Sequence, residues 1–370
     1  MKCTGYYDPE EREKEYGFHK IPLAIYRKKR YNEEKRAGTS GDEKEKKFMM
    51  TYGTLPYIDK PVSRLFAGTM LGCMSQGQDA SELLDQIYAM GINAFDSANV
   101  YGLAECSLGD WVEKRGLRDK LVIQTKGAHH DRWHIRVTPY DILSDVHTSL
   151  ARMKTDYIDI YLLHRDDETK PVGPIVETLN ALVDEGKIKA FGGSNWTHKR
   201  VAEANAYAAE HGLQGFTVVS PYYGLAVQHA DPFGGNCIGI SGPENAEARA
   251  YYRDNNIAVV PYSAIGAGFF SGRMKSSDPE GAKELVPGST VRGYFTEDNF
   301  QRLARVEELA SEKGYSVAQI AMAWVLHQDM DLYPIVGSSR VQGMADNVAA
   351  LEIKLTKEEL AYPDLESETK

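Results

Sequence analysis

The sequence predicts an α/β fold in which eight parallel strands and their helices close into a (β/α)8 barrel, the TIM-barrel architecture. Short apolar segments alternate with amphipathic ones along the chain, a pattern that favours a parallel sheet covered by helices. Eight such apolar segments occur, which favours closure of the sheet into a barrel. The chain has 370 residues, enough for one barrel of about 250 residues with additional segments.

Residues 1–55 differ in composition from the rest and are predicted to form a charged N-terminal extension that is partly helical. Both charge signs are dense here, and Glu–Lys and Glu–Arg neighbours at helical spacing support short helices. Two interpretations remain open, a solvated tail or an arm whose apolar residues around 21–26 anchor it on the barrel or on a partner subunit. The barrel is expected to occupy residues 56–370.

The predicted strands are short runs rich in apolar side chains. They span residues 65–69, 92–95, 121–125, 157–163, 188–191, 216–219, 257–261 and 332–336.

Capping residues mark several helix boundaries between these strands. A helix over residues 80–90 is apolar on one face and ends at Gly91. Thr138 followed by proline starts a second helix, and Thr197 caps a third. Ser316 with glutamine three residues later forms a capping box. Each boundary falls between two predicted strands, as a strand–helix repeat requires.

Composition narrows the class of protein. The net charge of −10 at pH 7 argues against a general binder of nucleic acid or anionic membranes, because phosphate binding needs an excess of Lys and Arg. The four cysteines show no zinc spacing and suggest reduced thiols. No apolar stretch approaches the roughly 20 residues that span a bilayer, and we see no signal peptide. We therefore expect a cytoplasmic protein that binds neither nucleic acid nor membrane, with a homo-oligomer left open.

Four chemically active side chains follow three neighbouring strands. Asp96 and Tyr101 come after strand 92–95, Lys126 after 121–125, and His164 after 157–163. The carboxyl ends of barrel strands meet at one mouth, where TIM-barrel enzymes carry out their chemistry.

These four groups form a proton-donating set. A nearby ammonium favours phenolate and so makes the Tyr101 phenol a usable acid, while Asp96 holds Lys126 in place. His164 can orient a carbonyl oxygen. Each residue alone would ordinarily be a turn, packing or surface residue, but all four at successive strand ends are a much rarer combination.

At these residues the chain resembles the aldo-keto reductases. The segments GINAFDSANVYGLAECSLGDWV, VIQTK and YIDIYLLHRDD are similar to strand and helix segments of that family, and the resemblance covers residues 61 to about 365. It implies a (β/α)8 barrel with an Asp, Tyr, Lys, His tetrad. Tyr101 would then be the general acid, and Asp96, Lys126 and His164 its partners.

The resemblance also implies a nicotinamide cofactor, with NADP(H) preferred and NAD(H) as the alternative. Tyr262 would stack on nicotinamide, and Ser220 stands where the family usually has a glutamine. Arg340 is the clearest cation for a phosphate, at a helix start that Ser339 and Gln342 would cap. The full set of expected cofactor-binding residues is Ser194, Asn195, Ser220, Tyr262, Ser263, Ile265, Gly268, Ser338, Arg340 and Asn347.

The glycine string at 266–272 has a competing interpretation as a Rossmann fingerprint. Its third glycine is one residue late, and it does not open a βαβ unit. We therefore favour the barrel interpretation of this segment.

The sequence also offers candidate residues for the walls of a substrate pocket. Loops at the barrel mouth offer Met74, Trp133, Trp196 and Tyr223 as pocket walls, and the glycine-rich stretch 226–245 resembles a pocket-edge loop. The histidines at 129, 130 and 134 lack metal-ligand spacing, so we expect no metal.

The sequence thus predicts an NADP-dependent reductase that converts an aldehyde or ketone, sugar-like or aryl, to an alcohol. Two alternatives stay open. The first is a nucleotide-binding regulatory subunit with little or no turnover. The second is a barrel lyase or isomerase that uses Lys126 as a Schiff-base amine.

Overall fold

The computed structural model describes residues 49–370, and the predicted extension at 1–55 lies outside this range except for its last seven residues. Among the described residues, eight parallel strands follow one another around a sheet in the order β10-β3-β4-β5-β6-β7-β8-β9. The strands are β1 (Tyr52–Gly53), β2 (Val62–Ser63), β3 (Phe66–Gly68), β4 (Ala94–Asp96), β5 (Val122–Gly127), β6 (Ile158–Leu163), β7 (Ile188–Ser194), β8 (Val218–Ser220), β9 (Ala258–Val259) and β10 (Ile335–Val336).

Backbone hydrogen bonds close this sheet into a barrel. Val259 N donates to Asp331 O at 2.9 Å, and Tyr333 N donates to Val259 O at 2.9 Å. Ile335 N donates to Pro261 O at 2.9 Å, which joins the segment carrying β10 to the segment carrying β9. The predicted (β/α)8 fold is therefore confirmed, and each of the eight predicted strand segments overlaps an observed strand.

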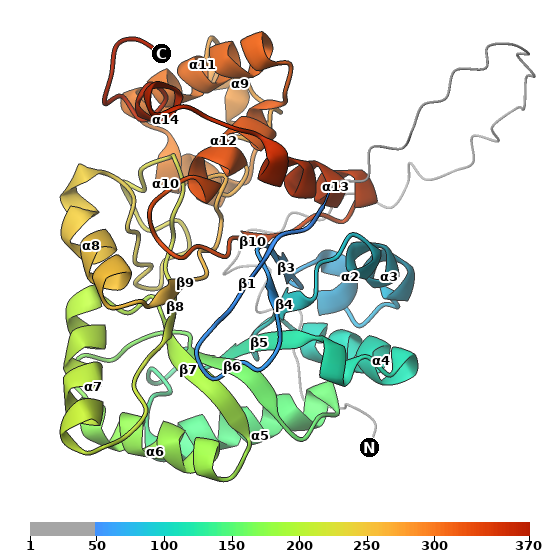
Figure 1. Cartoon of the computed structure of the whole chain (residues 1–370), viewed down its shortest axis with the longest axis vertical. Helices are drawn as coiled ribbons and strands as arrows, with labels where there is room; N and C mark the ends of the chain where they lie inside the picture. The colour runs from blue at the N-terminus through green and yellow to red at the C-terminus, as the bar shows by residue number, and fades with distance from the viewer. Residues whose placement is uncertain (1–48) are drawn as a thin grey trace, which may run out of the picture. The chain divides into compact units, whose positions relative to one another are not determined.

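Helices surround the barrel, and those of the last quarter of the chain gather on one side of it (Figure 1). Their bounds are α2 (Gly72–Ser75), α3 (Ser81–Ala89), α4 (Ala104–Arg115), α5 (Pro139–Met153), α6 (Val172–Asp184), α7 (His198–Glu210), α8 (Ala246–Asp254), α9 (Pro279–Ala282), α10 (Gly288–Tyr294), α11 (Glu297–Lys313), α12 (Val317–Leu326), α13 (Val341–Ala349) and α14 (Lys357–Ala361), with 3-10 turns at Arg118–Lys120, Pro243–Asn245 and Ala350–Glu352.

Three of the predicted helix caps form as the sequence indicates. The Thr138 hydroxyl accepts from Asp141 N and starts α5, and the Thr197 hydroxyl accepts from Arg200 N and starts α7. Ser316 forms both bonds of its capping box at the start of α12. These bonds satisfy backbone N–H groups that have no partner inside the helix.

The barrel interior is apolar at the end where the strands begin. The antiparallel hairpin of β1 and β2 brings apolar side chains to this end, and the segment carrying β1 crosses the barrel in Figure 1. One buried cluster joins the hairpin to all eight strand segments: Leu55, Ile58, Val62, Phe66, Ala94, Val122, Ile160, Leu162, Ala190, Val218, Ala258, Val260 and Tyr333. Burying this apolar surface is the main favourable term in folding.

The alternation of side chains along a strand explains why polar groups collect at the other end. Residues two apart share one face of a strand, so Asp96 continues the inward row of Ala94, and Lys126 continues that of Val122. The same spacing continues the inward rows of β6, β7, β8 and β9 to His164, Ser194, Ser220 and Tyr262. The interior thus changes from apolar to polar toward the carboxyl ends of the strands.

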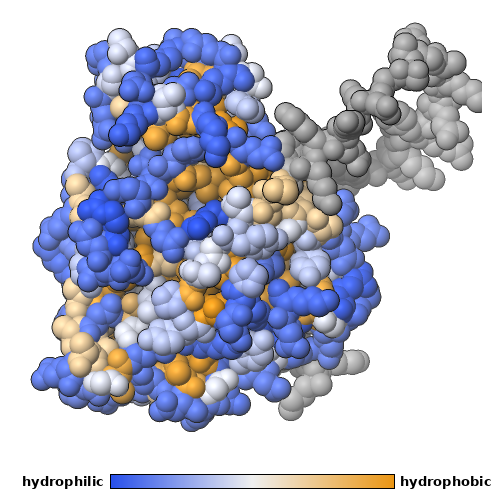
Figure 2. All heavy atoms as spheres, viewed as in Figure 1, coloured by the Kyte–Doolittle hydropathy of each residue, from blue (hydrophilic) through white to orange (hydrophobic). Residues whose placement is uncertain are grey.

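The face of the molecule in Figure 2 is largely hydrophilic. Figure 2 shows polar and charged side chains over most of the face in view, interrupted by smaller apolar areas. No helix among the described residues is long and apolar enough to cross a membrane.

Candidate active site

Asp96 and Lys126 form a buried ion pair at the carboxyl ends of β4 and β5. Their exposed fractions are 3% and 2%, and the Lys126 ammonium donates to Asp96 Oδ1. Lys126 Nζ also donates to Ser97 O at 3.0 Å, and Gln124 Nε2 donates to Asp96 Oδ1 at 2.7 Å. Both charges are therefore paired and further hydrogen-bonded, as burial requires.

The Tyr101 ring lies against this pair and against His164. Lys126 Nζ is 5.3 Å from the centroid of the Tyr101 ring. The rings of Tyr101 and His164 meet edge to face with centroids 5.9 Å apart. The structure thus brings together all four residues that the sequence predicted to cluster.

Burial and the neighbouring charges set the protonation of the phenol and the amine. Burial raises the pKa of Tyr101 above its ordinary value, and the positive charge of Lys126 acts in the lowering direction without reversing the shift. Burial lowers the pKa of Lys126, but the charge of Asp96 and contact with Tyr101 outweigh it, so the pKa is raised overall. At neutral pH the phenol is protonated and the amine is an ammonium.

His164 is a neutral imidazole in this setting. Burial lowers its pKa well below 6.5, and the charge of Arg165 lowers it further. Its Nδ1 is buried without a hydrogen-bond partner. A buried polar atom of this kind is available to a ligand.

A buried polar network supports the loop that carries Tyr101. Glu105 on α4 is fully buried and accepts from Thr125 Oγ1 at 2.7 Å. Arg152 on α5 contacts Glu105 Oε2 at 3.3 Å and donates to Asn99 O at 2.8 Å. Asn99 N in turn donates to the carbonyl oxygen of Lys126 at 2.8 Å. Sequence reasoning missed this network because its members are far apart along the chain.

Four of the predicted cofactor residues meet at the ends of β7, β8 and β9. Ser194 Oγ donates to Ser220 O at 2.8 Å, and Asn195 Nδ2 lies 3.2 Å from Ser194 Oγ. The Tyr262 hydroxyl donates to Asn195 Oδ1 at 2.8 Å. Ser220 Oγ is buried and has no partner, so this hydroxyl has unused hydrogen-bonding capacity.

The segment after β9 turns sharply. Ser263 has a φ of 53°, and Gly268 has a φ of 96°, a conformation in which glycine avoids steric strain. Ile265 lies within this turn and is half-buried.

The start of α13 differs from the sequence prediction. The N-cap residue of α13 is Arg340, whose side chain makes no capping hydrogen bond. The expected capping box of Ser339 and Gln342 does not form. The reason is that Ser338 Oγ accepts from Arg340 N at 3.0 Å, while Gln342 pairs with Asp346 instead. Arg340 is exposed, and Asn347 donates to Gly343 O at 2.8 Å.

The four predicted pocket walls do not form one open surface. Trp196 is buried and donates to Arg165 O at 3.1 Å, and Tyr223 is buried with its ring near Trp324. Met74 is fully buried, whereas Trp133 is 81% exposed. The glycine-rich stretch 226–245 is a loop apart from one short turn at its end.

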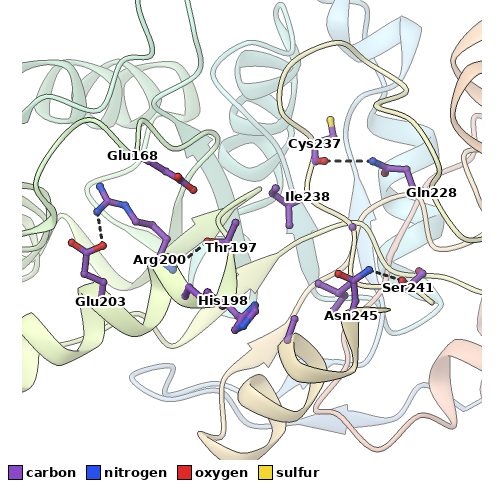
Figure 3. Close-up of a pocket in the computed structure, with 14 residues that line it drawn as sticks. Glu168, Thr197, His198, Arg200, Glu203, Gln228, Cys237, Ile238, Ser241 and Asn245 are labelled. Carbon is purple, nitrogen blue, oxygen red and sulfur yellow. Dashed lines mark hydrogen bonds and ion pairs between the residues drawn. The ribbon is translucent and has the colours of Figure 1, made fainter. Parts of the chain in front are cut away.

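A cleft of about 740 Å³ lies beside this loop (Figure 3). The start of α7 forms one wall with Thr197, His198 and Arg200, and the loop supplies Cys237 and Ile238. None of the four clustered residues lines it. Residues 49–370 hold no group of three or more metal-ligating side chains.

Comparison with known proteins identifies relatives for most of the chain. The model described as the aldo/keto reductase family matches residues 64–365. A probable aldo-keto reductase of Glycine max is 30% identical over 297 residues, 77% of this chain and 78% of the relative. Norsolorinic acid reductase B of Dothistroma septosporum is 28% identical over 304 residues, 77% of this chain and 72% of the relative. A probable aryl-alcohol dehydrogenase of Saccharomyces cerevisiae is 28% identical over 312 residues, 79% of this chain and 88% of the relative.

Proposed function

The chain belongs to the aldo/keto reductase family, and from that premise we propose that it reduces an aldehyde or ketone to an alcohol with a nicotinamide cofactor and a proton from Tyr101. The observation that carries the proposal is the position of the Tyr101 ring. Its centroid lies 5.3 Å from Lys126 Nζ and 5.9 Å from the centroid of the His164 ring. A protonated phenol beside a fixed ammonium and a neutral imidazole suits proton donation to a carbonyl oxygen.

Each group has a separate part in this proposal. Tyr101 Oη holds the proton and releases it as negative charge develops on the substrate oxygen. The Lys126 ammonium stabilises the resulting phenolate, because opposite charges attract strongly where water is excluded. His164 is neutral, so it can donate one hydrogen bond to the substrate oxygen without competing as an acid.

The cofactor would be held by residues at the strand ends and at the start of α13. The free Ser220 hydroxyl, with Ser194 and Asn195, fits the carboxamide of a nicotinamide, and the Tyr262 ring offers a flat surface for stacking. Ser338, Arg340 and the uncapped N–H groups of α13 fit a phosphate. When bound, the cofactor supplies the hydride that reaches the carbonyl carbon.

We prefer NADP(H) because Arg340 is exposed at the helix start and can donate hydrogen bonds to the phosphate that distinguishes NADP(H) from NAD(H). NAD(H) is the alternative. For the substrate we propose an aryl carbonyl. The relative named as a probable aryl-alcohol dehydrogenase supports an aryl substrate over a sugar.

The Schiff-base alternative is not favoured. A nucleophilic lysine must lose its proton, whereas the pair with Asp96 holds the pKa of Lys126 above its ordinary value despite burial.

The test is oxidation of NADPH and of NADH with a panel of aryl and sugar aldehydes. We expect turnover with aryl aldehydes, and Tyr101→Phe should lower kcat by roughly 10²–10⁴-fold. Tyr140→Phe is the matched control, since that tyrosine is 79% exposed on α5, and it should keep wild-type kcat. Wild-type turnover by Tyr101→Phe would contradict the proposal. Binding of NADPH without its oxidation across the panel would favour the regulatory alternative.

A further inference from the structure

We propose that Arg152 is a positioning residue for the reduction, because it holds the loop that carries Tyr101 in register with the strand that carries Lys126. This inference rests on the proposed reductase function and adds to it a residue in the helical layer, outside the barrel interior. It is carried by hydrogen bonds that Arg152 and its partner Glu105 make to the residues beside Tyr101 and Lys126.

The segment 97–103, which we call the tyrosine loop, joins β4 to α4 without regular secondary structure. Two backbone bonds attach it to its surroundings. Asn99 N donates to the carbonyl oxygen of Lys126 at 2.8 Å, and Leu103 N donates to that of Ser75 at 3.0 Å. The position of the phenol over the barrel mouth therefore depends on how firmly the middle of this loop is held.

Arg152 on α5 holds the loop from the side of the helices. Its Nη1 donates to Asn99 O at 2.8 Å and contacts Glu105 Oε2 at 3.3 Å. The carbonyl oxygen of Asn99 is thus bound by the guanidinium, while the N–H of the same residue is bound by β5. Both polar groups of the backbone two residues before Tyr101 are fixed in this way.

Glu105 connects the same guanidinium to β5. Its carboxylate is fully buried and accepts from Thr125 Oγ1 at 2.7 Å. Thr125 directly precedes Lys126, so its side chain points toward the helices while that of Lys126 points into the barrel. A buried carboxylate needs a cation, and Arg152 supplies it. One ion pair therefore links the tyrosine loop to the strand position next to Lys126.

Loss of this link should displace the phenol rather than the ammonium. Lys126 Nζ stays bound to Asp96 and donates to Ser97 O at 3.0 Å, whereas the Tyr101 ring is held beside it at 5.3 Å. Burial raises the pKa of Tyr101, and the charge of Lys126 is the strongest influence in the opposite direction. A displaced phenol would be both misaimed and a weaker acid.

The experiment measures single-turnover oxidation of bound NADPH by an aryl aldehyde between about pH 6 and pH 10, with wild type and with Arg152→Met. We expect the rate at neutral pH to fall about 10- to 100-fold in the variant, as a misplaced reacting group causes. The loss of rate at alkaline pH, which reports deprotonation of the phenol, should move to higher pH because the ammonium is farther away. The affinity for NADPH, measured by fluorescence titration, should be unchanged.

Lys60→Met is the matched control for a purely structural effect. Lys60 pairs with the fully buried Asp159 at 2.7 Å, at the end of the barrel where the strands begin, and Arg118 also contacts this carboxylate at 2.8 Å. The substitution also takes a cation from a buried carboxylate, but far along the strands from the tyrosine loop. Once circular dichroism shows that the protein is folded in the assay, its rate and its alkaline limb should equal those of wild type.

Thr125→Val tests the same link from β5 and decides the matter if Arg152→Met does not fold. It keeps the shape of the side chain and removes the hydroxyl that donates to Glu105. We expect the single-turnover rate to fall about 3- to 10-fold, the equivalent of one hydrogen bond, with the alkaline limb again moved to higher pH.

The possible failures are distinguishable. If wild type oxidises NADPH but folded Arg152→Met and Thr125→Val keep its rate and alkaline limb, the positioning role is overturned and the proposed reductase function stands. A lowered rate with an unmoved alkaline limb, matched by Lys60→Met, would also overturn it, since that is a general structural loss. If wild type binds NADPH without oxidising it, the reductase proposal fails, and this inference with it.

Discussion

Breaking the Asp96–Lys126 pair should destabilise the fold, because either partner left alone is a buried charge. Asp96→Asn keeps the shape of the side chain but removes its charge. Lys126 would then be left 2% exposed, with Ser97 O at 3.0 Å as its remaining strong acceptor. Lys126→Met removes the ammonium and leaves the carboxylate with Gln124 Nε2 at 2.7 Å.

The magnitude follows from the burial of both charges. Removing one partner of a buried ion pair costs about 3–5 kcal/mol, because the other charge stays in a medium that solvates it poorly. We expect about 3 kcal/mol for each single variant, the lower end, since one hydrogen bond remains in each. The double variant Asp96→Asn/Lys126→Met buries no charge here, so it should lose about 3 kcal/mol rather than the sum of about 6 kcal/mol.

Urea unfolding at pH 7, followed by far-UV circular dichroism, measures all three free energies. The difference between the double variant and the sum of the singles is the coupling energy of the pair. Additive losses within about 0.5 kcal/mol, or single losses below about 1 kcal/mol, would refute the view that the pair is desolvated and mutually dependent.

Three other predictions follow from the packing and the charges. Burial keeps the pKa of His164 well below 6.5 in the folded chain. As the pH falls below about 6.5, only the unfolded chain binds a proton at this imidazole, so the free energy of unfolding decreases. His164→Asn should reduce that decrease, measured by urea unfolding at pH 6.5 and 5.5, by up to about 1 kcal/mol. Arg152→Met should lower stability by about 2–4 kcal/mol, because it leaves Glu105 buried without its cation, whereas no change in midpoint would refute the network. Gly109→Ala would place a Cβ 2.6 Å from backbone atoms of α5 and should cost about 1–3 kcal/mol, while Gly288→Ala, with open space around it, should be neutral or stabilising; equal midpoints would contradict this packing.

The strand–helix repeat was predictable because it depends on local chemistry. Runs such as 157–163 are apolar enough to define a strand alone, and the hydroxyl caps at Thr138 and Ser316 act within three residues. The four clustered residues were also predictable, because the carboxyl ends of parallel strands meet at one mouth whatever the details of packing.

Features that depend on distant residues were not predictable. Arg152 and Glu105 are 47 residues apart in sequence, and neither has a local signal for pairing. The aromatic ring of Trp196 could be assigned to a pocket or to the interior from sequence alone, and the structure encloses it.

The most direct test of the central claim is single-turnover oxidation of bound NADPH after mixing with an aryl aldehyde, compared between wild type and Tyr101→Phe. Fluorescence titration of NADPH in both proteins establishes that the cofactor is bound before mixing. The proposal predicts similar NADPH affinity and a rate lowered roughly 10²–10⁴-fold in Tyr101→Phe, because the phenol proton is no longer available. An equal rate in both proteins would contradict the assignment of Tyr101 as the proton donor.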